Sequence, residues 1–264
     1  MKKELIFLRK ILLSIAGYDP TSGAGALLDL KTFEHLGFQG MAILTSLTSQ
    51  NTSIVKEVFC LSADFLQNQY QTLCYDISFS GIKVGMVGSQ KNIQVIAAIL
   101  SNNPKIPKVI DPVFKSSSGT WLFEKEAIPS YISKIRGKAS LFTPNMEEAS
   151  MISGIKMNTL EDIKEAAEQI YKLSNIPCLI KGGYLPKQKL DLLYDGKKYH
   201  FFKKEKIEKK VHGTGCFLSS SLLAYLVKGN PLEKACSLAS QLTHKAIKAA
   251  TQIGQGQHII HFSF

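Results

Sequence analysis

Short apolar segments of strand length recur along the chain, separated by segments whose apolar residues follow a helical spacing. The expected strands are residues 11–16, 41–44, 81–84, 108–110, 140–142 and 178–180. The expected helices include residues 25–36, 63–73, 92–100 and 160–173. Because strands that alternate with helices form βαβ units, this order predicts an α/β fold with a central, mostly parallel sheet and helices on both faces. In such sheets ligands bind beyond the carboxyl ends of the strands.

The pattern changes after residue 182. Segments 191–194 and 199–202 flank Asp195-Gly196, a dipeptide typical of a two-residue hairpin turn. The charged run 203–210 is most simply a solvated turn or strand edge. Two helices are expected next, over 216–226 and from Pro231 to about residue 250. Neither repeats nor low-complexity linkers interrupt the 264 residues, so we expect one domain over 1–264.

Composition and charge limit the classes of partner. The net charge of +11 suits nucleic acid, a membrane surface or an anionic small substrate, but the lysines do not alternate with aromatic residues as in nucleic-acid-binding motifs. No apolar run reaches the roughly 18 residues of a membrane-spanning helix. Arg9 and Lys10 interrupt the first apolar stretch, so residues 1–10 are interpreted as a short leader to the first strand. Five cysteines without a CxxC pair indicate a reducing compartment. We expect a cytoplasmic protein that binds neither nucleic acid nor membrane.

The segment His212-Gly213-Thr214-Gly215-Cys216 precedes an apolar helix. Its glycines allow successive backbone N–H groups to converge, and the helix adds its own N–H groups and positive dipole end. Together they suit a phosphoryl group in transfer, whereas a glycine turn that only starts a helix is the alternative. The thiolate of Cys216 is expected to be favoured at a helix N-terminus, so that it can accept a proton from a substrate hydroxyl or orient it. A small buried apolar residue is the alternative for Cys216.

The first loop, residues 16–25, follows a strand and opens a helix. It is not a complete GxGxxG, and no GxxxxGK[ST] occurs in the chain, which excludes P-loop chemistry. Asp29 lies inside the following helix, where it either complements the helix dipole or reaches a ligand amine.

Later loops also place polar residues after expected strands. Asn145 and Glu148 have the spacing of a capping box, and alternatively they hold phosphate-bound Mg²⁺ through water. Asp111 ends its own strand and can join them. Lys181 precedes two glycines and offers a cation for the phosphates of a nucleotide. The joint placement of these residues at strand ends favours phosphoryl transfer.

An ordered set of motifs extends along nearly the whole chain. They are SIAGYDPTSGAG (14–25), DLKTF (29–33), SQNT (49–52), IKVGMVG (82–88), DPV (111–113), SSGT (117–120), TPNMEEA (143–149), KGG (181–183), HGTGC (212–216) and a His-containing ending (258–262). In these motifs the sequence resembles the hydroxymethylpyrimidine/phosphomethylpyrimidine kinases of thiamine biosynthesis. The resemblance implies a ribokinase-like fold, ATP, Mg²⁺, a small-molecule pyrimidine substrate and a homodimer. The implied activity is phosphorylation of 4-amino-5-hydroxymethyl-2-methylpyrimidine and then of its monophosphate to the pyrophosphate.

The resemblance also implies roles for individual residues. Asp29 and Gln50 match the residues that recognise the aminopyrimidine, and the Gln50 amide supplies both a donor and an acceptor. The pocket walls match Gly17, Ala24, Met86 and Val113. The ATP-binding positions match Asn145 and Lys181, and the metal-binding positions match Asp111 and Glu148. Gly213, Thr214 and Gly215 match the anion hole, with Cys216 at the catalytic position.

Three departures from the family pattern concern the same loops. Tyr18 replaces a small residue before Asp19, the lysine of segment 113–117 comes earlier than usual, and Tyr184 stands where a His commonly follows Lys-Gly-Gly. A cysteine at position 216 is typical of the pyrimidine kinases and also of a related pyridoxal kinase branch. A pyridoxal or pyridoxine kinase is therefore the alternative enzyme, and a non-catalytic binding protein on the same fold is an alternative of another class.

Overall fold

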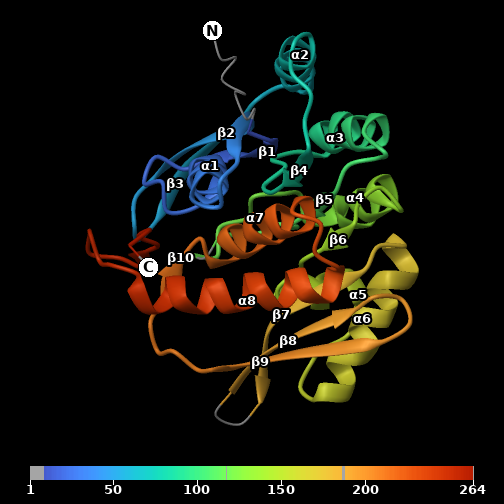
Figure 1. Ribbon diagram of the computed structural model, residues 1–264, viewed down its shortest axis with the longest axis vertical. Coiled ribbons are helices and arrows are strands. Elements are labelled where there is room, and N and C mark those ends of the chain that lie inside the picture. The colour runs from blue at the N-terminus through green and yellow to red at the C-terminus, as the bar shows by residue number, and fades with distance from the viewer. Residues whose placement is uncertain (1–8, 117, 186–187, 264) are drawn as a thin grey trace, which may run out of the picture.

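Among the residues that the structure describes, nine strands form one sheet through the molecule (Figure 1). The computed structural model describes residues 9–116, 118–185 and 188–263, so most of the expected leader lies outside the described residues. The strands are β1 (Ile11–Tyr18), β2 (Gln39–Gln50), β3 (Val55–Cys60), β4 (Gly81–Val84), β5 (Lys108–Ile110), β6 (Leu141–Phe142), β7 (Cys178–Leu185), β8 (Gln188–Tyr194) and β9 (Tyr199–Glu205).

The centre of the sheet is parallel and its edges are antiparallel. The strand order is β3-β2-β1-β4-β5-β6-β7-β8-β9, and every neighbouring pair from β2 to β7 is parallel. Strands β3, β8 and β9 pair antiparallel with their neighbours. The mostly parallel α/β sheet predicted from the sequence is confirmed. Strand β3 was not predicted, because most of its residues are exposed and it lacks an apolar alternation.

Helices cover both faces of the sheet. They are α1 (Gly25–His35), α2 (Ala63–Cys74), α3 (Gln90–Asn102), α4 (Ile128–Ile135), α5 (Met146–Ser153), α6 (Leu160–Ser174), α7 (Thr214–Val227) and α8 (Leu232–Ala249). Adjacent residues of β1 point to opposite faces: Leu13 packs in the core formed with α2 to α6, whereas Leu12 packs in the core formed with α1, α7 and α8. The predicted covering of both faces is confirmed.

The hairpin predicted around Asp195-Gly196 joins β8 and β9, and the predicted strand ends at 194 and 199 are confirmed, although the loop is longer than a two-residue turn. The strands end and begin at Tyr194 and Tyr199, so the loop contains four residues, 195–198. Oδ1 of Asp195 accepts hydrogen bonds from the backbone N–H groups of Lys197 at 2.8 Å and Lys198 at 2.7 Å. The Asp195 carboxylate therefore closes a wider turn than the dipeptide alone specifies. The charged run begins in β9, which is an edge strand, as predicted.

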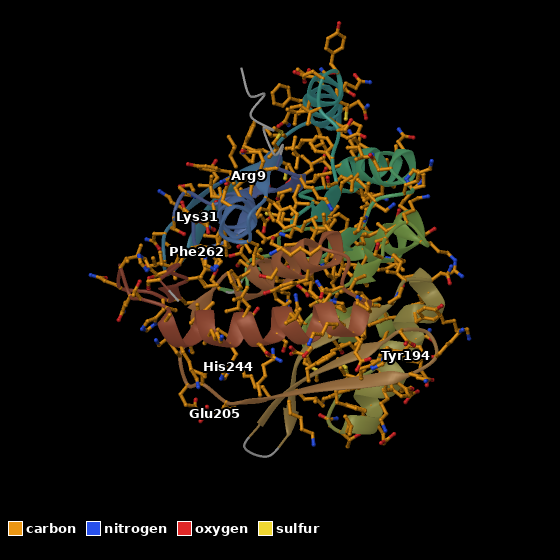
Figure 2. The ribbon with its side chains drawn as sticks, viewed as in Figure 1. Arg9, Lys31, Tyr194, Glu205, His244 and Phe262 are labelled. Carbon is orange, nitrogen blue, oxygen red and sulfur yellow. The ribbon has the colours of Figure 1, made fainter. Side chains whose placement is uncertain are left out.

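The C-terminal segment contacts the loop that follows β2 and pairs with the short strand before α7. Strand β11 (His258–Ile259) pairs in parallel with β10 (Val211–His212), which leads directly into α7. Just before it, the Gln257 N–H donates to the carbonyl oxygen of Thr52 at 2.9 Å. A Cβ atom on Gly256 would lie 2.0 Å from that oxygen, so only glycine fits there. Phe262, which is labelled in Figure 2, then packs against His35 and Phe217, with ring centroids 5.2 and 5.9 Å from its own.

Candidate active site

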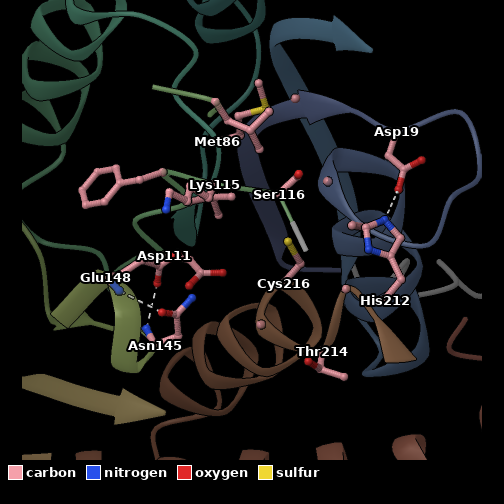
Figure 3. A pocket seen from close by; sticks show the side chains of 18 of the residues that line it. Asp19, Met86, Asp111, Lys115, Ser116, Asn145, Glu148, His212, Thr214 and Cys216 are labelled. Atoms are coloured by element: carbon pink, nitrogen blue, oxygen red, sulfur yellow. Dashed lines mark hydrogen bonds and ion pairs between the residues drawn. The ribbon is translucent and has the colours of Figure 1, made fainter. Parts of the chain in front are cut away.

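A cavity of about 370 Å³ lies at the carboxyl ends of the central strands, where the sequence predicted the ligand site (Figure 3). With one exception, every predicted site residue lines it. The residues in this set are Gly17, Ala24, Gln50, Met86, Asp111, Val113, Asn145, Glu148, Lys181, Gly213, Thr214, Gly215 and Cys216. Their loops come from positions almost 200 residues apart, and the parallel sheet brings them to one edge.

The loop before α7 has the geometry of an anion-binding turn. Gly213 has φ 77° and serves as the N-cap of α7. A Cβ atom there would lie 1.8 Å from the carbonyl oxygen of Gly23, so any side chain would collide with the first loop. The first N–H groups of an α-helix lack intrahelical acceptors, and here they belong to residues that line the cavity. The N-terminus of α7 thus presents donors and its positive dipole end to a ligand.

The predicted state of Cys216 is wrong. Burial raises the pKa of its thiol to about 11, and the neighbouring Lys83 ammonium opposes this shift only in part. The position at a helix N-terminus led to the expectation of a favoured thiolate, but burial is the largest influence on this pKa and favours the thiol. At neutral pH the group is a thiol that lines the cavity beside Gly215.

An ion pair between Lys181 and Asp111 lies against the anion-binding turn. The Lys181 ammonium contacts Oδ1 of Asp111, and both side chains are largely buried. The hydroxyl of Thr143 donates to the same Oδ1 at 3.2 Å. A Cβ atom on Gly215 would lie 3.2 Å from Nζ of Lys181 and 3.4 Å from Oδ2 of Asp111. The turn, a cation and a carboxylate therefore converge on one point in the cavity.

The two interpretations of Asn145 and Glu148 are compatible. The capping box forms, because the Asn145 N–H donates to Oε2 of Glu148 at 2.7 Å and the Glu148 N–H donates to Oδ1 of Asn145 at 2.9 Å. Both side chains also line the cavity. Burial raises the pKa of the Glu148 carboxyl, Lys181 opposes this effect and Asp111 adds to it. A cation bound between these carboxylates would relieve their repulsion.

Asp19 connects two walls of the cavity and was missed as a site residue, although it lies within a quoted motif. Its Oδ2 accepts a hydrogen bond from Nε2 of His212 at 2.9 Å, and its Oδ1 accepts from the Thr21 hydroxyl at 2.7 Å. Burial opposes ionisation, but the hydrogen bonds from His212, Gln50 and Thr21 together lower the pKa of this carboxyl. Gln50, at the end of β2, therefore lies close to the first loop.

The substrate-binding role expected for Asp29 is corrected by the structure. Asp29 is fully buried in α1 and does not line the cavity. Both of its carboxylate oxygens contact Nζ of Lys83, at 2.8 and 3.0 Å. Ser14 and Ser220 donate to the same carboxylate at 2.6 and 2.8 Å. With these partners the carboxylate is held inside the protein and does not line the cavity.

Several lining residues were not predicted individually. They include Tyr18, Thr48, Phe114, Lys115, Glu147, Met151 and His212. Most of them are immediate neighbours of motif residues, so adjacency to a motif at a strand end was the signal available in the sequence. Lys115 also lies in the segment where the chain departs from the family pattern.

Comparison with known families identifies the chain. A family model described as phosphomethylpyrimidine kinase matches residues 19–261. The chain belongs to the phosphomethylpyrimidine kinase family. A hydroxymethylpyrimidine/phosphomethylpyrimidine kinase of Aquifex aeolicus is 38% identical over 96% of this chain and 100% of that protein. A kinase of the same name from Rhizobium meliloti is 38% identical over 95% of this chain and 96% of its own length.

Solved structures support the same assignment of fold. The ADP complex of Bacillus subtilis pyridoxal kinase superposes with a TM-score of 0.87, at 30% identity, over 97% of this chain and 98% of that one. A phosphomethylpyrimidine kinase from Clostridium difficile has a TM-score of 0.78, at 33% identity, over 90% of this chain and 100% of that one. The predicted ribokinase-like fold is confirmed. Within the described part of this family member, no helix is long and apolar enough to cross a membrane.

Proposed function

We propose that the protein transfers the γ-phosphoryl group of ATP to the hydroxymethyl oxygen of 4-amino-5-hydroxymethyl-2-methylpyrimidine, and then phosphorylates the monophosphate to the pyrophosphate. The observation that carries this proposal is the convergence of the α7 turn, Cys216 and the Lys181–Asp111 pair in one cavity. The relatives named for this activity match nearly the full chain, which supports thiamine biosynthesis or salvage as its setting.

The acceptor occupies the end of the cavity near the first loop. Gln50 pairs with the amino group and ring nitrogen of the pyrimidine, since its amide has one donor group and one acceptor. Gly17, Ala24, Met86 and Val113 form the apolar walls. A Cβ atom on Gly17 would lie 2.8 Å from Sδ of Met86, so the glycine leaves room for a flat ring beside this side chain.

Cys216 positions the acceptor hydroxyl. With a pKa of about 11, Cys216 is almost entirely protonated at neutral pH, so little thiolate is present to act as a base. Phosphoryl transfer through a loose transition state requires alignment and charge stabilisation more than early deprotonation of the nucleophile. The backbone N–H groups of Gly213, Thr214 and Gly215 supply that stabilisation at the transferred group.

The opposite end of the cavity suits nucleotide phosphates and Mg²⁺. Lys181 and Asn145 are assigned to ATP, and Asp111 and Glu148 to the metal. No group of three or more potential metal ligands occurs among the described residues. This donor set fits Mg²⁺, which is commonly held by one or two carboxylates together with water and phosphate oxygens. When bound, Mg²⁺ would neutralise negative charge on the phosphates.

The test is a steady-state phosphorylation assay with ATP and Mg²⁺, comparing hydroxymethylpyrimidine, its monophosphate and pyridoxal. Turnover of the first two acceptors is expected. Pyridoxal is the alternative substrate because the chain superposes on pyridoxal kinases at TM-scores of 0.86 and 0.87. Turnover of pyridoxal alone would assign the protein to the pyridoxal kinases. No turnover of any acceptor would favour the hypothesis of a non-catalytic binding protein.

Three further expectations belong to this proposal. We propose that residues 1–264 act as one domain, that the protein functions in the cytoplasm and that it forms a homodimer. Free cysteines suit a reducing compartment, and sedimentation of the full chain would measure its assembly state.

A further inference from the structure

Lys115 lines the cavity but has no role in the scheme above. It lies four residues after Asp111, on a short turn whose backbone bridges Lys115 and Trp121. The Leu122 N–H donates to the carbonyl oxygen of Phe114 at 2.8 Å and holds this turn at the cavity. The ammonium of Lys115 lies 4.5 Å from the centroid of the Trp121 ring and contacts Oε1 of Glu147. The aromatic ring limits where the lysine side chain can go.

The two lysines that line the cavity differ in how firmly they are held. Lys181 pairs with Asp111, whose side chain is only 2% exposed. Releasing that lysine would leave the Asp111 carboxylate buried without a counter-ion. Lys115 pairs with Glu147, whose side chain is 59% exposed. Exposed ion pairs contribute little to stability, and water can solvate Glu147 once the lysine leaves. Lys115 can therefore exchange its partner for an anion in the cavity at low cost.

The two proposed acceptors differ by one phosphate. The alcohol is uncharged at its reacting end, whereas the monophosphate brings two additional negative charges into a cavity already lined by Asp19, Asp111, Glu147 and Glu148. Val113 of the acceptor wall is followed by Phe114 and Lys115, and all three line the cavity, where Figure 3 shows the Lys115 side chain. A cation on that wall is what a phosphomonoester requires and an alcohol does not.

We propose that Lys115 breaks its ion pair with Glu147 and binds the phosphate of the monophosphate acceptor. Lys115 thereby determines the affinity for the acceptor of the second phosphorylation. This inference rests on the proposed function. Glu147 acts as the exchangeable counter-ion that occupies the lysine while the cavity holds the alcohol.

The experiment compares KM and kcat of the full chain for both acceptors. Lys115→Gln is expected to raise KM for the monophosphate by about ten- to a hundredfold, the range for a charged hydrogen bond, and to raise KM for the alcohol much less. Lys115→Arg should restore most of the loss, and Glu147→Gln should lower KM for the monophosphate by releasing the lysine. Lys105→Gln, an exposed lysine outside the cavity, is the matched control.

Other results would overturn the inference. Equal losses on both acceptors in Lys115→Gln would make the lysine a general structural residue, and a raised KM for ATP would place it on nucleotide phosphates. Either outcome leaves the proposed function standing, because the unmodified protein would still phosphorylate both acceptors. If the unmodified protein phosphorylates neither, the proposed function fails and the role of Lys115 fails with it.

Discussion

The imidazole of His212 donates to the carboxylate of Asp19 across 193 positions of sequence, with 2.9 Å between Nε2 and Oδ2. Asp19 belongs to the first loop, and His212 directly precedes the N-cap of α7. Thr21 also donates to this carboxylate, and Gln50 lies close enough to lower its pKa, so one side chain joins the wall assigned to the pyrimidine to the turn assigned to the phosphoryl group.

Replacing Asp19 tests that connection. Asp19→Asn keeps the size of the side chain but removes its charge, so the hydrogen bond from His212 weakens. We expect kcat/KM for hydroxymethylpyrimidine to fall by about tenfold or more, with a smaller change in KM for ATP. Steady-state kinetics with each substrate varied in turn would show this. Equal changes for the two substrates would argue against a specific link to the acceptor wall.

Asp19→Asn should also change how the stability of the fold depends on pH. Because the pKa of Asp19 is lowered in the folded protein, its ionised form stabilises the fold above the unfolded pKa of about 4. That contribution is lost as pH falls through the lower folded value. Urea unfolding at neutral and acidic pH should therefore show less loss of stability on acidification in Asp19→Asn than in the unmodified protein.

The thiol state of Cys216 predicts slow alkylation. With a pKa of about 11, the reactive thiolate is scarce at neutral pH, and its fraction rises about tenfold per pH unit until that value is approached. Iodoacetamide labelling followed by mass spectrometry would measure the rate, with exposed Cys74 in the same chain as the reference. Fast labelling of Cys216 at neutral pH would show that its pKa is not raised.

Cys216→Ala separates positioning from packing. The variant should fold and bind ATP while its turnover falls by about a hundredfold, the cost of misplacing a reacting group. Cys216→Ser, which keeps a hydrogen-bonding group, should retain more activity than Cys216→Ala. An unchanged rate in Cys216→Ala would reduce the residue to a packing role.

Gln50→Ala tests recognition of the pyrimidine. Loss of the amide should raise KM for hydroxymethylpyrimidine by about ten- to a hundredfold, because ring polar groups would be left unpaired, and should affect KM for ATP far less. Gln39→Ala, at the exposed start of β2, is a control on the same strand. A parallel loss for ATP would contradict the assigned role.

The buried pair of Lys83 and Asp29 predicts a stability effect. Lys83→Met would leave the Asp29 carboxylate buried without its cation and should lower the free energy of unfolding by about 3–5 kcal/mol. Urea denaturation would measure the loss. A double variant, Lys83→Met with Asp29→Asn, should be less destabilised than the sum of the single variants, because the pair is coupled.

Much of the fold was predictable because buried parallel strands are short and mostly apolar. Strands β4 and β5 have the predicted bounds, 81–84 and 108–110. Strands β10 and β11 have two residues each, which is too short for any periodicity. Their pairing depends on contacts between distant segments, which a local pattern does not contain.

The site was predictable as a set of loops but less so as individual side chains. A motif places Asp29 near the ligand, yet its partner Lys83 is 54 positions away and turns the carboxylate into a buried support. The pKa of Cys216 depends on burial, which a sequence does not reveal. The capping box of Asn145 and Glu148, in contrast, is local, and its geometry followed from spacing alone.

Two late contacts form only at the end of synthesis. They are the contact of Gly256 and Gln257 with Thr52 and the pairing of β11 with β10. Every residue assigned to the cavity precedes residue 217, so a nascent chain carries all of them before residues 256–259 exist. Translation proceeds from the N-terminus, and early segments begin to fold first. The loops at Thr52 and His212 nevertheless receive their last backbone partners only from those late residues. A chain still being translated therefore holds its catalytic groups before it holds the contacts that fix their arrangement.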